Sequence, residues 1–124
     1  MKIKGVLIDV ENNIAESREI ERNLDTYYKV LNCDLIQIVN MSINGKYFDI
    51  ICDEEGTFKE SPKISAIDSN YQPMLVGNLF ICNTRNGNEI SLSEEEINHV
   101  LKCIRLLGTN KHPNPYPILT KVEY

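Results

Sequence analysis

The chain has 124 residues, of which 42% are hydrophobic and 25% are charged, a composition typical of one small globular domain. Its formal net charge of −5 argues against a long DNA or RNA partner, because a phosphate backbone requires a basic surface. The charge is compatible with a small anionic ligand, which needs only a few local cations. No apolar stretch approaches the roughly 20 residues of a membrane helix, so we expect no membrane association and a cytoplasmic location.

The first third of the chain predicts a strand pair followed by a short helix. An apolar run at 2–10 predicts a strand rather than a signal peptide, since it is short and lacks a cleavage site of small residues. Residues 14–20 suit a partner strand, although the same residues also fit a helix. Residues 23–32 predict a helix in which Asn23 is the N-cap and Asn32 adopts the left-handed conformation at the end.

Residues 35–53 contain the clearest hairpin. The segments LIQIVNMSI and KYFDIICD flank Asn44-Gly45, a pair that favours a two-residue type I′ turn. Such a turn fixes the register and places Ile43 opposite Lys46. One face of the hairpin is then apolar and should meet the core. The other face mixes apolar and polar side chains, so we expect a helix or another subunit to cover part of it.

Beyond this hairpin, irregular and regular segments alternate. Residues 57–76 contain two prolines and no firm periodicity, which predicts a long connection. Residues 77–84 then predict a strand that ends in a tight turn at Asn86-Gly87, and 89–91 predict its brief partner strand.

A strong helix signal follows. Ser93 and Glu96 form a capping box, and three successive glutamates complement the positive end of the helix dipole. Apolar residues at helical spacing continue to Ile104, and Gly108 lies where the helix is expected to end. The glutamates are thus explained without any catalytic role.

The remaining tail has three prolines at alternate positions and cannot begin as a helix. We therefore predict a proline-rich C-terminal arm over 109–124, whose last residues could add a strand to the chain's own sheet or to a neighbour's. Residues 1–124 are predicted to form a single α+β domain: an antiparallel sheet of hairpins with two helices packed on it.

The sequence contains no signature of a catalytic site. It has no nucleophile motif, no phosphate loop, no GxGxxG fingerprint and no H-E-x-x-H pair. The four cysteines are widely spaced and the two histidines have no ligand spacing, which predicts small buried thiols and neither a metal nor a cofactor. Catalytic groups that meet only in space escape such a search, but we predict a protein that is not an enzyme.

Binding residues are easier to place. Arg85, at the mouth of the 86–87 turn, offers a planar cation for phosphate, and Asn88 offers an amide for sugar hydroxyls or base edges. Phe80, on the same strand, is either a core residue or a stacking platform for a base. Arg105, expected in the last helical turn, either faces the negative end of the helix or binds an anion.

The C-terminal arm carries a second group of candidates. Lys111, His112 and Tyr116 place a cation, a titratable imidazole and an aromatic ring close together on a segment stiffened by proline. They could close over an anion, or they could form a solvated tail.

Residues 47–62, YFDIICDEEGTFKESP, and 77–100, GNLFICNTRNGNEISLSEEEINHV, resemble a small domain of unknown function that is common in phages and mobile elements. In that family a hairpin ends in an acidic glycine turn. A proline-containing connection then leads to a Gly-Asn strand, a glycine turn and a helix that opens S-L-[ST]-x-E-E. The likeness covers about residues 35–105.

At this length and with this tail, the chain resembles in particular the phage-encoded Thoeris anti-defence proteins of the first type. This resemblance implies a non-enzymatic sponge that holds cyclic ADP-ribose isomers and CBASS cyclic oligonucleotides intact in the cytoplasm of an infected bacterium. It also implies a homo-oligomer, a dimer or a hexamer, with pockets between subunits. By their chemistry, Phe80 would stack, Arg85 and Arg105 would bind phosphate, Asn88 would bind ribose or base, and 111–116 would be the lid.

The alternative function is that of an interaction protein. An acidic surface and a partly apolar sheet face are compatible with a phage protein that binds and inhibits a host protein. A ligand panel separates the two hypotheses, because only the sponge is stabilised by a cyclic nucleotide.

Overall fold

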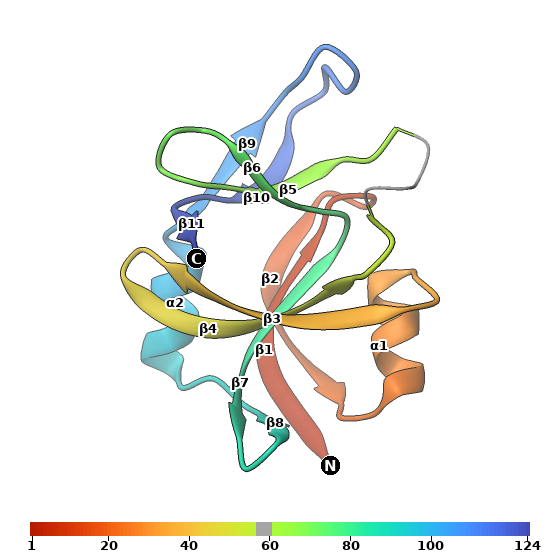
Figure 1. Ribbon diagram of the computed structural model, residues 1–124, viewed down its shortest axis with the longest axis vertical. Coiled ribbons are helices and arrows are strands. Elements are labelled where there is room, and N and C mark those ends of the chain that lie inside the picture. The colour runs from red at the N-terminus through yellow and green to blue at the C-terminus, as the bar shows by residue number, and fades with distance from the viewer. Residues whose placement is uncertain (57–60) are drawn as a thin grey trace.

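The computed structural model describes residues 1–56 and 61–124, and its elements form two sheets and two helices (Figure 1). The larger sheet has the strand order β11-β3-β4-β7-β1-β2, with β8 paired to β7. The smaller sheet has the order β6-β5-β10-β9. The bounds are β1 Lys2–Asp9, β2 Ile14–Glu21, α1 Leu24–Leu31, β3 Ile36–Ile43, β4 Lys46–Asp53, β5 Ile64–Ile67, β6 Pro73–Val76, β7 Leu79–Arg85, β8 Asn88–Ile90, α2 Glu94–Leu101, β9 Ile104–Leu107, β10 Tyr116–Leu119 and β11 Val122–Glu123.

The predicted α+β class, with hairpins forming an antiparallel sheet and two helices packed on it, is confirmed. All pairings in the larger sheet are antiparallel, whereas β5 and β10 of the smaller sheet run parallel. In the described residues, neither helix has the length and apolar character that a membrane-spanning helix requires.

The 35–53 hairpin has the predicted register, with Ile43 opposite Lys46. Both turn residues have positive φ, 47° at Asn44 and 89° at Gly45, as a type I′ turn requires. The 14–20 segment is the strand β2, which pairs along its whole length with β1. Local turn chemistry therefore determines the register of the β3–β4 hairpin.

Both predicted helix starts are also confirmed. The Asn23 side chain accepts a hydrogen bond from the Thr26 amide, and Asn32 closes α1 with a φ of 52°. At the start of α2, the Glu96 amide donates to Ser93 Oγ and the Ser93 amide donates to Glu96 Oε1. These reciprocal bonds form the capping box that the sequence predicts.

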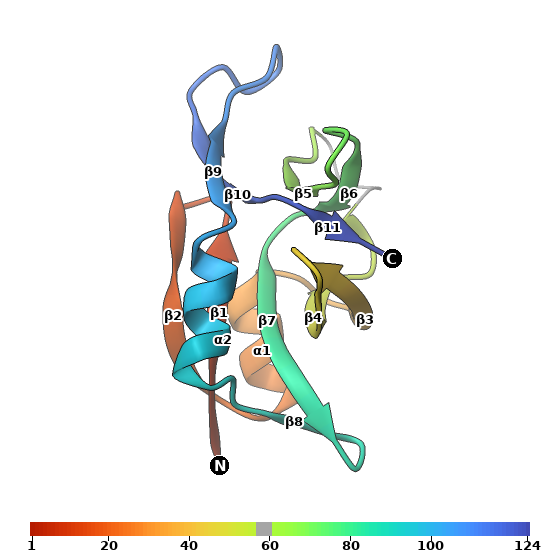
Figure 2. The same cartoon turned by 90° about the vertical axis from the view of Figure 1, so that its left-hand side faces the viewer.

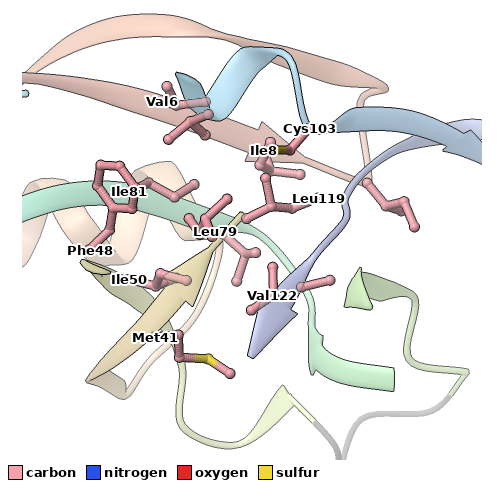
Figure 3. Packing of buried hydrophobic residues seen from close by; sticks show 14 of the residues in the cluster. Val6, Ile8, Met41, Phe48, Ile50, Leu79, Ile81, Cys103, Leu119 and Val122 are labelled. Carbon is pink, nitrogen blue, oxygen red and sulfur yellow. The ribbon is translucent and has the colours of Figure 1, made fainter. Parts of the chain in front are cut away.

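Two hydrophobic clusters occupy the opposite faces of the larger sheet. Alternation along β1 sends Val6 and Ile8 to one face and Leu7 to the other. The larger cluster joins this sheet to α2 and to β10 of the smaller sheet. Figure 3 labels ten of its side chains, among them Leu119 of β10. The smaller cluster packs against Tyr27 and Leu31 of α1. The two helices therefore cover different faces of one sheet (Figure 2).

The predicted extension of the second helix to Gly108 is wrong. α2 ends at Leu101, and Ile104 already belongs to β9, which pairs with β10. The carbonyl of the intervening residue, Cys103, accepts hydrogen bonds from both the amide and the hydroxyl of Thr120. This long-range pairing takes the place of the helical bonds that the local apolar spacing favours.

The predicted irregular connection at 57–76 is also wrong in part. It contains β5 and β6, two strands of four residues that pair with bulges. Pro73 stands at the start of the edge strand β6, where its missing N–H costs no ladder bond. Residues 57–60 of this stretch lie outside the described residues.

The C-terminal segment adds strands to its own chain rather than forming a free arm. β10 joins the smaller sheet and is fully buried, while β11 pairs with the end of β3. The connection at 108–115 projects from the body of the molecule (Figure 1). Of the predicted arm, only this connection can move as a lid without opening a sheet.

Candidate functional site

Two cavities lie at opposite ends of the smaller sheet. β5 and β10 run parallel, with Leu119 beside Ala66, so the first residues of both strands share one end of the sheet. The first cavity, about 370 Å³, lies at that end, and the second, about 210 Å³, lies where the two strands finish. We call them the first cavity and the second cavity.

The first cavity combines apolar walls with a polar loop. The start of β5 and the end of β6 supply the apolar side, and the loop after β9 supplies amide, hydroxyl and cationic groups. The loop is closed by two hydrogen bonds: the Thr109 amide donates to the His112 carbonyl, and the His112 amide donates to Thr109 Oγ1. The lining residues are Pro62, Ile64, Val76, Thr109, Asn110, Lys111, His112 and Tyr116.

Tyr116 is a fixed wall of the first cavity rather than part of a mobile lid. Its side chain is 1% exposed, and its hydroxyl donates to the Ile64 carbonyl at 2.9 Å. The Lys63 ammonium lies 5.4 Å from the centre of its ring, a cation–π contact. Burial raises the pKa of Tyr116, so the phenol is neutral and adds no negative charge to the cavity.

His112 supplies an unsatisfied hydrogen-bonding group. Its ring meets the Tyr116 ring edge-on, with 6.5 Å between centroids. Its Nε2 atom is buried and has no hydrogen-bond partner among the residues that the structure describes. Because buried polar atoms are nearly always paired, a ligand in the first cavity is a natural partner for this nitrogen. The nearby Lys111 is exposed and gives the same loop a positive charge.

Arg105 lines the second cavity. Its Nη1 donates to the carbonyls of Lys102 and Ile104, at 2.8 and 2.7 Å, which orients the guanidinium at the end of α2. The expected place of Arg105 in the last helical turn is wrong, because Arg105 belongs to β9. Its Nη1 nevertheless bonds the Lys102 carbonyl at the end of α2. The rest of the exposed group is available to an anion.

The second cavity also contains residues that sequence reasoning missed. Lys121 adds a second cation, and Tyr71 adds an aromatic ring that is 81% exposed. Both have left-handed backbones, with φ of 59° and 62°, a strained conformation for a bulky residue. Asp68 holds the Tyr71 turn by accepting hydrogen bonds from the amides of Asn70 and Gln72. Its carboxylate partly offsets the positive charge of the cavity.

Arg85 and Asn88 lie elsewhere, at the tip of the β7–β8 hairpin, where they are exposed partners across the turn (Figure 1). The hairpin is attached to α1 close to its turn, because the Tyr27 hydroxyl donates to Glu89 Oε1 at 2.7 Å. In Figure 1 it points away from the smaller sheet. Within one chain these two residues therefore do not join the cavity residues.

Phe80 does not reach any of these surfaces. It is 1% exposed and belongs to the cluster between the larger sheet and α1. Its ring covers Gly5, where a Cβ atom would lie 2.7 Å from the ring. The stacking role expected for Phe80 is wrong, because a base could reach it only by displacing the core. The alternative interpretation, a core residue, is the one the structure has.

Three of the four cysteines, Cys52, Cys82 and Cys103, are buried thiols, and Cys33 is partly buried. Burial raises the pKa of Cys52 to about 11, and burial with the negative charges of Asp49 and Glu89 raises the pKa of Cys82 to about 12. At neutral pH both are protonated and therefore poor nucleophiles. In the described residues there is no group of three histidine, cysteine, aspartate or glutamate side chains that could hold a metal ion.

Comparison with known proteins gives a single relationship. Residues 1–105 match a family described as a domain of unknown function, DUF3846. No curated protein and no solved structure matches the chain. The matched residues include the larger sheet up to β8 and Arg105, whereas Lys111, His112 and Tyr116 lie beyond them. Since the match covers most of the 124 residues, the chain belongs to the DUF3846 family.

Proposed function

We propose that this protein is a non-enzymatic sponge that binds and sequesters cyclic nucleotide immune signals. The ligands would be cyclic ADP-ribose isomers and the cyclic oligonucleotides of CBASS systems, and their capture would block bacterial anti-phage defence. The observation that carries the proposal is the first cavity, where apolar walls, a lysine and a buried unpaired imidazole nitrogen meet.

The size and chemistry of the first cavity suit such a ligand. Its volume of about 370 Å³ lies within the roughly 300–1,000 Å³ of small-molecule sites. Ile64 and Val76 offer an apolar surface to a base, and Asn110 offers an amide to a base edge or a ribose hydroxyl. Lys111 and His112 offer charge and a hydrogen bond to phosphate.

Capture without cleavage is consistent with the same lining. The described residues of the first cavity include no carboxylate that could orient His112 as a general base. Interactions that stabilise the bound ground state as much as the transition state increase affinity but do not accelerate the chemical step. A cyclic nucleotide held there would therefore be retained intact.

The second cavity supplies a further phosphate position. Arg105 and Lys121 are two cations on an acidic chain, and Tyr71 is exposed enough to stack on a base. At about 210 Å³, this cavity suits a phosphate with part of a nucleoside rather than a whole cyclic dinucleotide. In a homo-oligomer, the exposed Arg85 and Asn88 could complete either cavity from a neighbouring chain.

The proposal is tested by thermal shift with a panel of cyclic ADP-ribose isomers, cyclic dinucleotides and cyclic trinucleotides. A ligand that binds only the folded state stabilises it by about 2.7 kcal/mol at 100 times its Kd. We expect at least one compound to raise Tm, and both Lys111→Ala and His112→Ala to reduce the shift. Lys29→Ala is the matched control, because this exposed lysine lies on α1, away from both cavities.

Two outcomes would contradict the proposal in different ways. If no compound raises Tm at saturating concentration, the alternative of a protein that binds a host protein is favoured. If a compound binds but is recovered changed after denaturation and chromatography, the protein is an enzyme and not a sponge.

A further inference from the structure

The outer edge of β3 is open along most of its length. On its inner side β3 pairs with β4 from Ile36 to Ile43 without interruption. On its outer side, within the described residues, it pairs only with β11, through Ser42 and Ile43. Figure 2 shows β3 at the margin of the larger sheet. The stretch 36–41 therefore presents an unpaired strand edge.

The backbone groups on this edge can be identified from the hairpin register. In a two-residue hairpin, Ile43 and Lys46 exchange hydrogen bonds directly across the turn, and alternate residues behind them do the same. The residues between them direct their N–H and C=O groups outward. Those outward residues in the open stretch are Ile36, Ile38 and Asn40.

This edge lacks the features that usually keep sheet edges from pairing. Natural edge strands carry charges, prolines or bulges. The segment 35–45, LIQIVNMSING, contains no charged residue and no proline, and its register has no shift. Ile38 is 44% exposed and Tyr47, on the same face, is 62% exposed. The other edge of the same sheet, β2, has the protected sequence IAESREIE.

We propose that β3 pairs with β3 of a second copy of this chain, antiparallel and about a twofold axis. With the axis at Ile38, each Ile38 lies opposite its counterpart, and Ile36 lies opposite Asn40. This register uses all the outward groups of the open stretch and stops where β11 begins to pair. The larger sheet of one copy and the larger sheet of the other then form one continuous sheet.

Charge favours β3 over β2 as the contact, and the symmetry of antiparallel strand pairing favours a second copy as the partner. Two chains with a formal charge of −5 repel each other over most of their surface. The 35–45 segment brings no charge into the contact, whereas pairing of β2 with itself would bring three glutamates and only one arginine, Arg18, from each chain. An antiparallel strand pair is self-complementary, so one surface serves both subunits.

Sedimentation equilibrium on the full chain over a concentration series tests the proposal. We expect the wild type to be a dimer, with twice the chain mass of 14.2 kDa. Ile38→Lys should be a monomer with the mass of one chain, because the substitution places two ammonium groups opposite each other in the contact. Glu19→Lys is the matched control on the other edge and should leave the dimer intact. Circular dichroism and melting curves show whether each variant is folded.

A cross-linking measurement checks the register separately. Ile38→Cys should form an intermolecular disulfide under mild oxidation, because paired strands bring these Cα atoms to about 5.5 Å. Glu19→Cys should not cross-link. A monomeric wild type would overturn the proposal. The proposal would also be overturned if the Ile38→Lys variant is still a dimer and the Ile38→Cys variant does not cross-link. The chains would then associate through another surface.

Discussion

The Tyr27–Glu89 hydrogen bond connects α1 to the β7–β8 hairpin and can be removed by deleting one atom. The Tyr27 hydroxyl donates to Glu89 Oε1 at 2.7 Å, across 62 residues of sequence. The ring is 3% exposed and packs in the smaller cluster. Tyr27→Phe keeps that ring and removes only the hydroxyl, so the packing contribution is retained.

The magnitude follows from the charge and exposure of the pair. Hydrogen bonds to charged groups contribute about 1.5–3 kcal/mol. Glu89 is only half-buried, so its carboxylate regains some hydration when the Tyr27 hydroxyl is removed. The loss of stability should therefore lie at the lower end of this range. We expect Tyr27→Phe to lower the free energy of unfolding by about 1–2 kcal/mol, and Tm by about 3–8 °C for a domain of this size.

Urea denaturation of wild type and variant measures this effect, with an unchanged m-value if only stability differs. Tyr28→Phe is the matched control, because the Tyr28 hydroxyl makes no hydrogen bond to another described residue. Burial and the neighbouring Glu89 raise the pKa of Tyr27. The stabilisation by the Tyr27–Glu89 hydrogen bond is therefore complete below about pH 10, the ordinary pKa of tyrosine, and is lost as the pH rises through the raised pKa of the folded state. If Tyr27→Phe and Tyr28→Phe have equal stability, or both match the wild type, the assigned bond does not contribute.

Three further predictions concern α2 and the arginines. Ser93→Ala removes the N-cap acceptor and should lower the free energy of unfolding by about 1 kcal/mol in urea titrations, and a change within error would contradict this. Although burial alone would raise it, hydrogen bonds from Ser93 and Asn83 lower the pKa of Glu96. The stability that Glu96 adds over Glu96→Gln should therefore be present at pH 6, begin to fall below the ordinary glutamate pKa of about 4.3, and be lost as the pH falls through the lowered pKa of the folded state. At least one of Arg85→Ala and Arg105→Ala should weaken cyclic nucleotide binding by about 1.5–3 kcal/mol in calorimetry, and wild-type affinity in both would remove these two assignments.

Features set by a few neighbouring residues could be predicted from the sequence. Asn44-Gly45 determines the β3–β4 register, and Ser93 with Glu96 determines the start of α2. The end of α2 could not be predicted, because the residues up to Ile104 keep helical spacing. What ends the helix is Thr120, which bonds the Cys103 carbonyl and is distant in sequence.

The candidate site was predictable only in its chemistry. Lys111, His112 and Tyr116 are close in sequence and share the first cavity, as their spacing indicates. Strand alternation gives the face on which Phe80 lies, but it does not show that α1 covers that face. Tyr71 was missed because its exposure depends on a turn within a stretch that lacks periodicity, although Asp68 before a serine and an asparagine is a turn signal.

Titration calorimetry of the wild-type protein with a cyclic ADP-ribose isomer, followed by chromatography of the recovered ligand, tests the central claim most directly. The account predicts saturable binding, loss of affinity in His112→Ala, and a ligand recovered intact after the protein is denatured. A titration without binding heat across the cyclic nucleotide panel, with His112 Nε2 still unpaired in crystals soaked with the same compounds, would contradict it.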